Sequence, residues 1–307
     1  MTISAKKTFI WGAAWAVICL MVLAAELTGE REIIFPEITA MLIGAWLAPR
    51  QPWFVPPGKI FLSVVILSVA GVLIVRFLPI PVFCQAAAGY ICAACCLLAL
   101  RITMFPLISA IILPILLGTE SWIYPLAASA LAAVVALGRA YLLKEGLTPP
   151  VAERWDYELR EQLPLWGKRL LAVVIFAVLA LGLRVPFAIA PPLLVGFTEL
   201  TNPGSPARKI PGKVWLMVVI AAVCGSGARL LLVTWLGLPL TLAAALAGAV
   251  FLFIVRKSGV YFPPAGAIAI LPMLLDKAIV PWLPLEVAVG FGVMVATALV
   301  LFKEKRE

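Results

Sequence analysis

Long apolar runs cover almost the whole chain, separated by short stretches rich in charged residues, proline and glycine. Cutting the sequence at those stretches gives about twelve apolar segments, several of them shorter than the ~20 residues that a helix needs to cross the hydrocarbon core of a bilayer. We therefore predict an all-α, polytopic membrane protein with about twelve transmembrane segments. The predicted segments are 8–25, 33–48, 59–78, 81–100, 103–118, 122–142, 168–183, 186–201, 213–235, 238–255, 260–276 and 282–302.

The short segments 33–48, 103–118, 186–201 and 260–276 carry prolines in or beside their apolar runs. A proline removes a backbone donor and strains the preceding turn, so an undisturbed helix is not expected there. In lipid, such a break persists only where protein or a water-filled cavity satisfies the freed carbonyls. We predict that these segments are proline-broken helices, either half-helices or re-entrant segments.

Two parts of the sequence are built alike. The stretch 104–117 matches 262–275 at an offset of 158 positions, and Pro57-Gly58-Lys59 reappears 154 positions later as Pro211-Gly212-Lys213. We predict two parallel repeats of six segments, which share one orientation and are related by an axis along the membrane normal. The predicted divisions are a first repeat at 1–143, a cytoplasmic linker at 144–167, a second repeat at 168–302 and a basic cytoplasmic tail at 303–307.

Composition and charge agree with this layout. The chain is 64% hydrophobic and 13% charged, against about 45–50% and about 25% in soluble globular proteins. The formal net charge of +9 does not indicate a nucleic-acid partner, because the basic residues are scattered in short loops and form no stripe interleaved with aromatic residues. Most of the 24 lysines and arginines fall on one side of the predicted layout, and the positive-inside rule places that side and both termini in the cytoplasm. We predict a multi-pass protein of a bacterial cytoplasmic (inner) membrane.

Catalytic constellations are missing from the sequence. It contains no histidine and no nucleophile, phosphate-binding or acidic metal-binding motif. The six cysteines all fall in apolar runs, and the spacing Cys92-x-x-Cys95-Cys96 has no polar loop around it. We interpret the cysteines as small residues that face lipid or another helix. The sequence predicts neither an enzyme nor a bound metal or cofactor.

Ionisable residues inside the apolar segments are the first candidates for a functional site, because in lipid they face a cavity or one another by default. Glu37 lies near the outer end of its segment, and Glu199 lies in a run with Thr198, Thr201 and Asn202. Two interpretations of the second run stay open. It lines a cavity, or it is a helix end at the cytoplasmic surface, since Asn202-Pro-Gly is a strong turn signal.

Proline-started helices supply the second group of candidates. Pro263 and Pro264 are followed by Ala-Gly266-Ala, where small residues let a ligand or another backbone come close, and where the N-terminal amides of a helix offer donors to an anion. Tight helix–helix packing is the alternative interpretation. The candidate substrate-binding residues are Glu37, Thr198, Glu199, Thr201, Asn202, Pro263, Pro264, Gly266, the first-repeat residues Phe105, Pro106 and Ser109, and the intrasegment charge Arg229.

From about Pro192 to Leu275 the chain resembles the HPP family of small bacterial and plastid membrane proteins. The residues that carry the resemblance are Gly196-Phe-Thr-Glu199, Gly204-Ser-Pro-Ala-Arg208 and Phe262-Pro-Pro-Ala-Gly-Ala267. The resemblance implies a helical membrane bundle and transport of a small anion such as nitrite. The histidine that gives the family its name is Phe262 here, so any role that needs an imidazole is absent. The predicted six-plus-six layout is also similar, more weakly, to the membrane part of the fusaric acid resistance/aromatic acid exporter group.

These features together favour a secondary transporter or exporter of a small solute, with an anion as the favoured class, that works by alternating access between the two repeats. The site is expected near 105–114, 190–203 and 262–272, with Glu199 or Glu37 as a proton-coupling carboxylate. The expected partners are the solute and the lipid bilayer, and a homo-oligomer stays open. The alternatives are a lipid-handling membrane protein and a membrane subunit of a larger complex.

Overall fold

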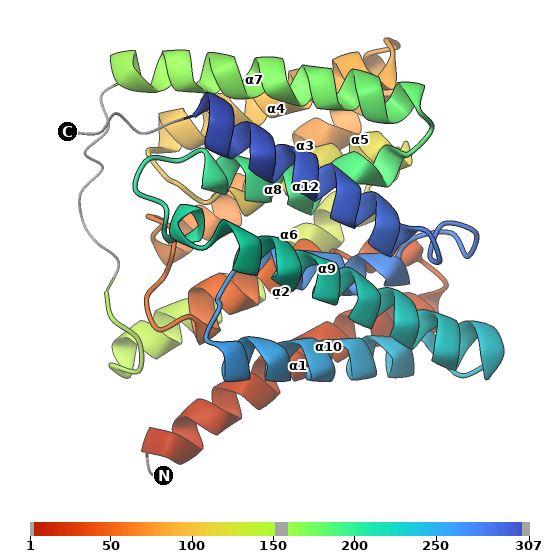
Figure 1. The fold of residues 1–307 in the computed structure, drawn as a ribbon. Helices are drawn as coiled ribbons and strands as arrows, with labels where there is room; N and C mark the ends of the chain where they lie inside the picture. The colour runs from red at the N-terminus through yellow and green to blue at the C-terminus, as the bar shows by residue number, and fades with distance from the viewer. Residues whose placement is uncertain (1–2, 151–158, 303–307) are drawn as a thin grey trace.

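The computed structural model describes residues 3–150 and 159–302 (Figure 1). Within these ranges the chain forms twelve α-helices and no strand, which confirms the all-α prediction, and each predicted apolar segment overlaps one helix. The helices are α1 (Ile3–Thr28), α2 (Glu37–Leu42), α3 (Pro57–Phe77), α4 (Val82–Leu100), α5 (Pro106–Leu117), α6 (Ile123–Lys144), α7 (Leu159–Gly182), α8 (Pro191–Leu200), α9 (Pro211–Ala228), α10 (Leu240–Ser258), α11 (Pro263–Ile270) and α12 (Leu283–Leu301).

Eight of these helices are long and apolar enough to cross a membrane, namely α1, α3, α4, α6, α7, α9 with the π-helical turns that continue it to Trp235, α10 and α12. The architecture is that of an α-helical membrane protein. The other four helices, α2, α5, α8 and α11, are shorter. They lie in the four proline-bearing segments that the sequence distinguishes from the rest.

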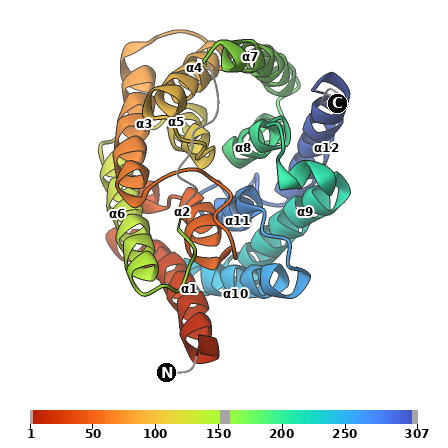
Figure 2. The same ribbon diagram turned by 90° about the vertical axis from the view of Figure 1, so that its left-hand side faces the viewer.

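The four short helices form the centre of the bundle, and the eight long helices surround them (Figure 2). Every residue of α2, α8 and α11 is buried. In this centre α2 packs against α11 and α5 packs against α8. The long helices instead present large apolar side chains outward, such as Leu137 and Trp235, which are 72% and 74% exposed. An apolar outer surface of this kind suits contact with lipid.

Prolines mark the points where the chain enters the buried centre. Pro106, Pro191 and Pro263 each stand at the first position of their helices, where the missing N–H has no helical partner in any case and the fixed φ angle suits the first turn. The connections before Pro106 and Pro263 lie at the same end of the bundle as the C-terminal end of α8, and that end holds the candidate site. The connection before Pro191 lies at the opposite end, where the Phe187 N–H donates to Glu286 in the first turn of α12.

The prediction that proline breaks the short helices is right for α11 and wrong for α5. In the second half α11 ends at Ile270, and Pro272 lies in a 3-10 turn. In the first half α5 continues without interruption through Pro114 to Leu117. The physical reason is a hydrogen bond, because the Tyr124 hydroxyl donates to the Ala110 carbonyl at 2.8 Å. That carbonyl is the one that Pro114 leaves without its helical donor.

The end of the predicted linker is helical. The sequence predicts a linker from 144 to 167, whereas α7 already begins at Leu159. Residues 151–158 of the predicted linker and the predicted tail at 303–307 lie outside the described residues. The helix therefore includes Arg169 well inside its length, where the sequence places it at a cytoplasmic boundary.

Candidate functional site

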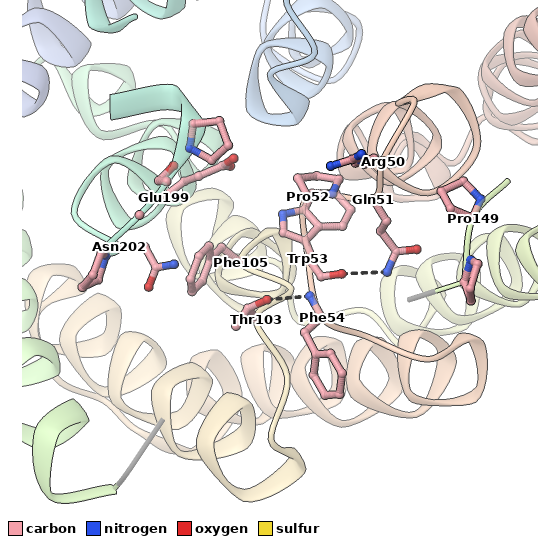
Figure 3. Close-up of a pocket in the computed structure, with 15 residues that line it drawn as sticks. Arg50, Gln51, Pro52, Trp53, Phe54, Thr103, Phe105, Pro149, Glu199 and Asn202 are labelled. Atoms are coloured by element: carbon pink, nitrogen blue, oxygen red, sulfur yellow. Dashed lines mark hydrogen bonds between the residues drawn. The ribbon is translucent and has the colours of Figure 1, made fainter. Parts of the chain in front are cut away.

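A cavity of about 500 Å³ lies at the proline-rich end of the bundle (Figure 3). Its walls come from the α2–α3 connection (50–54), the start of α5 (103–105) and the end of α8 with the loop that follows (199–206). A second cavity of about 390 Å³ shares several of these residues, Glu199 among them, and extends to 259–262 before α11. The site is thus assembled from segments that are far apart in the sequence but lie at the same end of the bundle.

Glu199 is the acidic residue of both cavity walls. It stands in the last turn of α8 and is 7% exposed. Its Oε2 atom has no hydrogen-bond partner, and among the described residues its side chain has no ion-pair partner. The C-terminal end of a helix is also unfavourable for a negative charge. A buried carboxyl in this setting requires a proton or a bound cationic group to neutralise it.

Three other residues of the larger cavity carry buried polar atoms without partners within the described part of the chain. These atoms are Trp53 Nε1, Gln51 Oε1 and Ser205 Oγ. Figure 3 shows Glu199 and Asn202 on one side of the cavity and Arg50 and Trp53 on the other. Buried polar groups of native proteins are nearly always hydrogen-bonded to protein, water or ligand. The cavity therefore offers a set of polar groups that a small polar molecule can satisfy.

The sequence-predicted residues Thr201, Asn202 and Phe105 meet around Arg169, which sequence reasoning missed. Arg169 is fully buried, and its Nε donates to Thr201 Oγ1 at 2.9 Å. Its guanidinium lies 4.7 Å from the ring centroid of Trp166 and 5.8 Å from that of Phe105, which is the range of a cation–π contact. Arg169 thus fixes the end of α8 and the start of α5, and so positions two walls of the cavity. The predicted segment begins at 168, one residue before Arg169. A prediction that began this helix at Leu159 would have placed Arg169 well inside it.

Thr198, the first of the predicted polar residues of α8, lies deeper and lines neither cavity. Its hydroxyl is 2.8 Å from the Tyr90 hydroxyl of α4 and 2.8 Å from the Leu194 carbonyl. Tyr90 was not among the sequence candidates. This pair connects α4 to α8. It holds α8 in place without lining either cavity.

Glu37 and Ser109 are brought together, but in a different place. Glu37 is 1% exposed and accepts a short hydrogen bond from Ser109 Oγ on α5, while its Oε2 has no partner among the described residues. Neither residue lines the two cavities. The second carboxyl thus lies in the closed centre of the bundle, between α2 and α5.

Pro263 and Pro264 are buried at the start of α11, and Gly266 packs this helix against α2. A Cβ atom on Gly266 would lie 2.5 Å from Ile43 Cδ1 and 3.0 Å from Thr39 Cγ2. The structure therefore supports the packing interpretation of this motif rather than direct binding. Pro106 is buried in the same manner at the first position of α5.

Arg229 is the one predicted charge that lies away from all of these groups. Its guanidinium donates from Nη1 to the Pro272 carbonyl, and to the Leu275 carbonyl at 2.5 Å. These carbonyls follow the end of α11, at the opposite end of that helix from the cavities. Arg229 therefore stabilises the interrupted end of α11.

No group of three or more cysteine, aspartate or glutamate residues in the described ranges could hold a metal ion. Comparisons with protein-family models, with curated proteins and with solved structures find no match for this chain. The resemblance to the HPP family and to the exporter group accordingly stays a prediction, and the function has to be argued from the site itself.

Proposed function

We propose that this protein is a secondary transporter of a small solute, built from two similar halves, with the solute site in the cavity between them. The observation that carries the proposal is the origin of the cavity walls. Arg50-Gln51-Pro52 and Gly204-Ser205-Pro206 line the same cavity, and they are 154 positions apart, the offset that relates the two halves in sequence. Sites at the interface between repeats are typical of secondary transporters.

Close helix contacts support the duplication. A Cβ atom on Gly71 of α3 would lie 2.7 Å from a backbone carbonyl of α5 and 2.7 Å from Pro114 Cγ. A Cβ atom on Gly225 of α9 would likewise meet a carbonyl of α11, and would lie 2.9 Å from Pro272 Cγ. Gly225 follows Gly71 by 154 positions and Pro272 follows Pro114 by 158, the two offsets already found in the sequence. The same helix approach therefore occurs once in each half.

Helix packing follows the same rule. The contact of α1 with α10 has its counterpart in that of α7 with α4, and the contact of α2 with α11 has its counterpart in that of α8 with α5. Each pair turns into the other when six is added to the number of its first-half helix and subtracted from the number of its second-half helix. This supports two parallel six-helix repeats, and we propose that the four short helices complete twelve crossings with both ends of the chain in the cytoplasm.

The proposed mechanism is rocking of one half against the other. The two central interfaces, α2 with α11 and α5 with α8, each join one helix from either half, so a relative rotation of the halves would open and close the cavity. Glu37 is the proposed proton-coupling group, because it lies next to these interfaces and one of its carboxyl oxygens has no partner in the described ranges. A buried carboxyl that exchanges a proton as the halves move would link flux to a proton gradient.

The experiment that tests the function is solute flux in proteoliposomes that contain the purified protein. Radiolabelled pools of small carboxylates, inorganic anions, amines and amino acids would be assayed by counterflow, with Ser205→Leu as the variant that fills the cavity. We expect saturable counterflow for one class, and at least a tenfold loss in Ser205→Leu. Ser129→Leu, a partly exposed serine on α6 away from the cavities, is the matched control and is expected to keep full flux. Equal flux in empty and protein-containing vesicles for every pool would contradict the proposal.

The lipid-handling alternative has one observation in its favour. A smaller cavity of about 270 Å³ lies between α1 and α6, with Lys6 at its rim and an otherwise largely apolar lining that includes Phe9, Trp46 and Tyr141. Its position suits an acyl chain. The alternative predicts that lipid, and none of the soluble pools, raises the melting temperature of the purified protein.

A further inference from the structure

Two residues of opposite charge, Glu199 and Arg50, stand on facing walls of the larger cavity at the proline-rich end of the bundle. Glu199 comes from α8 and Arg50 from the α2–α3 connection (Figure 3). Within the described residues neither side chain has an ion-pair partner. Arg50 is exposed and Glu199 is buried. Water can therefore solvate the charge of Arg50, whereas an ionised Glu199 requires a ligand of opposite charge.

The uncharged groups of the same cavity add a donor on the Arg50 side. Trp53 is 2% exposed, and its indole N–H has no acceptor among the described residues. On the other side Ser205, which is 6% exposed, lies next to the end of α8, and its hydroxyl has no partner in the part of the chain that the structure describes. Arg50 and Trp53 therefore offer donors on the wall that faces the carboxyl of Glu199.

We propose that the cavity binds a small zwitterion that carries both an ammonium and a carboxylate group, the chemical class of the α-amino acids. Glu199 receives the ammonium group, while Arg50 and the Trp53 N–H receive the carboxylate. Phe105, Phe54 and the prolines of the wall face the remainder of the solute. The cavity volume of about 500 Å³ lies within the range of about 300–1,000 Å³ that is typical of small-molecule sites. This assignment rests on the proposed transport function, whose site it specifies.

A solute with only one of the two charges fits this cavity less well. A plain anion could bind beside Glu199 only if this carboxyl kept a proton, because two negative charges at a buried contact are strongly unfavourable. A protonated Glu199 would no longer provide the charge that an ammonium group pairs with. A plain cation would satisfy Glu199 but leave the Trp53 N–H unpaired. Since Arg50 is exposed to solvent, the loss of the carboxylate costs less than the loss of the ammonium group. The ammonium group is therefore the stronger determinant of binding.

The test is thermal stabilisation of the purified full-length protein by three matched pools: L-amino acids, the corresponding L-amino acid amides, and the corresponding 2-hydroxy acids. Ligand that binds only the folded state raises stability by RT ln(1 + [L]/Kd). We expect the amino acids to give the largest shift, the amides a smaller one, and the hydroxy acids none. Individual amino acids from the active pool would then be titrated against the variants.

Two variants that each remove one charge assign the groups. Glu199→Gln is expected to weaken amino acid binding at least tenfold, and Arg50→Gln to abolish the preference for amino acids over amides. Glu286→Gln is the matched control for the first variant, because this carboxyl accepts the Phe187 N–H at 2.9 Å outside the cavity. It is expected to bind like the unmodified protein.

The failure of this inference can be separated from the failure of the transport proposal. Stabilisation by the hydroxy acids as strong as that by the amino acids would overturn the zwitterion assignment, while counterflow of those acids would keep the transporter. Unchanged amino acid binding in Glu199→Gln would overturn the role of Glu199. The absence of both stabilisation and counterflow for every pool would overturn both proposals.

Discussion

The helices α5 and α11 have matching prolines, yet they end differently. In α5 the helix passes through Pro114 because the Tyr124 hydroxyl takes the place of the missing helical donor at the Ala110 carbonyl. In α11 the helix stops before Pro272. The start of α12 contributes Trp-Leu-Pro-Leu at 282–285, none of which carries a hydroxyl. Arg229 instead binds the carbonyls of the turn that follows.

The difference teaches that a proline in a buried membrane helix does not decide by itself whether the helix breaks. Its effect depends on whether a neighbouring helix offers a donor to the freed carbonyl. A tyrosine hydroxyl preserves the helix in the first half, and an arginine stabilises its interruption in the second. Each of the following variants changes a contact that keeps α5 continuous or that stabilises the end of α11.

The largest effect is expected for Arg229→Met. This change leaves the carbonyls of Pro272 and Leu275 without their donor, and a buried unsatisfied group costs about 1–3 kcal/mol. We expect a strongly lowered melting temperature in detergent. The control is Arg76→Met, since Arg76 is exposed and its guanidinium lies over the Trp122 ring. Surface changes of that kind stay within about 0.5 kcal/mol. Equal melting temperatures for the two variants would show that Arg229 does not hold the end of α11.

The next effect concerns the glycines against which the two prolines pack. Gly71→Ala and Gly225→Ala each force a methyl group onto a neighbouring helix, and overpacking costs about 1–3 kcal/mol. The second variant should lose more, because the α11 carbonyl lies closer to Gly225 than the α5 carbonyl lies to Gly71. The control is Gly227→Ala in the same helix, where a Cβ atom meets nothing within 4 Å. It should be neutral or stabilising by up to about 1 kcal/mol. Calorimetry in detergent distinguishes the three, and equal tolerance of all would contradict the close approach.

Tyr124→Phe tests the hydrogen bond between the Tyr124 hydroxyl and the Ala110 carbonyl of α5 directly. The ring keeps its edge contact with Phe35, whose centroid lies 6.0 Å away, but the Ala110 carbonyl loses its donor. We expect a loss of about 1–2 kcal/mol of unfolding free energy, since the carbonyl is buried. Tyr141→Phe on the same helix is the control, because Tyr141 is 59% exposed and should change stability by less than about 0.5 kcal/mol. Amide hydrogen exchange should also rise in α5 around Pro114 in the first variant alone.

Much of the fold can be predicted from the sequence, because hydrophobic runs and their proline and glycine boundaries are local properties. Each of the twelve helices overlaps one predicted segment, and the four short helices lie in the four short segments. The continuity of α5 could not be predicted, since it depends on a hydroxyl from another helix. Arg169 was missed for a related reason. Its side chain is an interior group because it packs between the end of α8 and the start of α5, which lie far from it in the sequence.

The candidate site was predicted in part. Glu199, Asn202 and Phe105 do line one cavity, while Glu37 lies elsewhere, in the closed centre. A sequence identifies buried charges through their apolar surroundings, but it does not say which helices leave space between them. Neither Arg50 nor Trp53 stands out in the sequence. Both lie in the loop between α2 and α3, and only the position of the equivalent loop after α8 makes them part of a site.

The smallest expected effect, that of Pro114→Ala, gives the sharpest test of the contrast. Alanine restores an N–H four residues after Ala110, so the helix regains its own donor and the Tyr124 hydroxyl becomes redundant. We expect the single change to alter stability by less than about 1 kcal/mol, because lost proline packing against Gly71 offsets the new hydrogen bond. The Tyr124→Phe cost should then shrink in the Pro114→Ala background, and a double-mutant cycle measures that coupling. An additive cycle would mean that the tyrosine does not substitute for the missing donor. The continuity of α5 would then require another cause, and the difference from α11 would come from Arg229 alone.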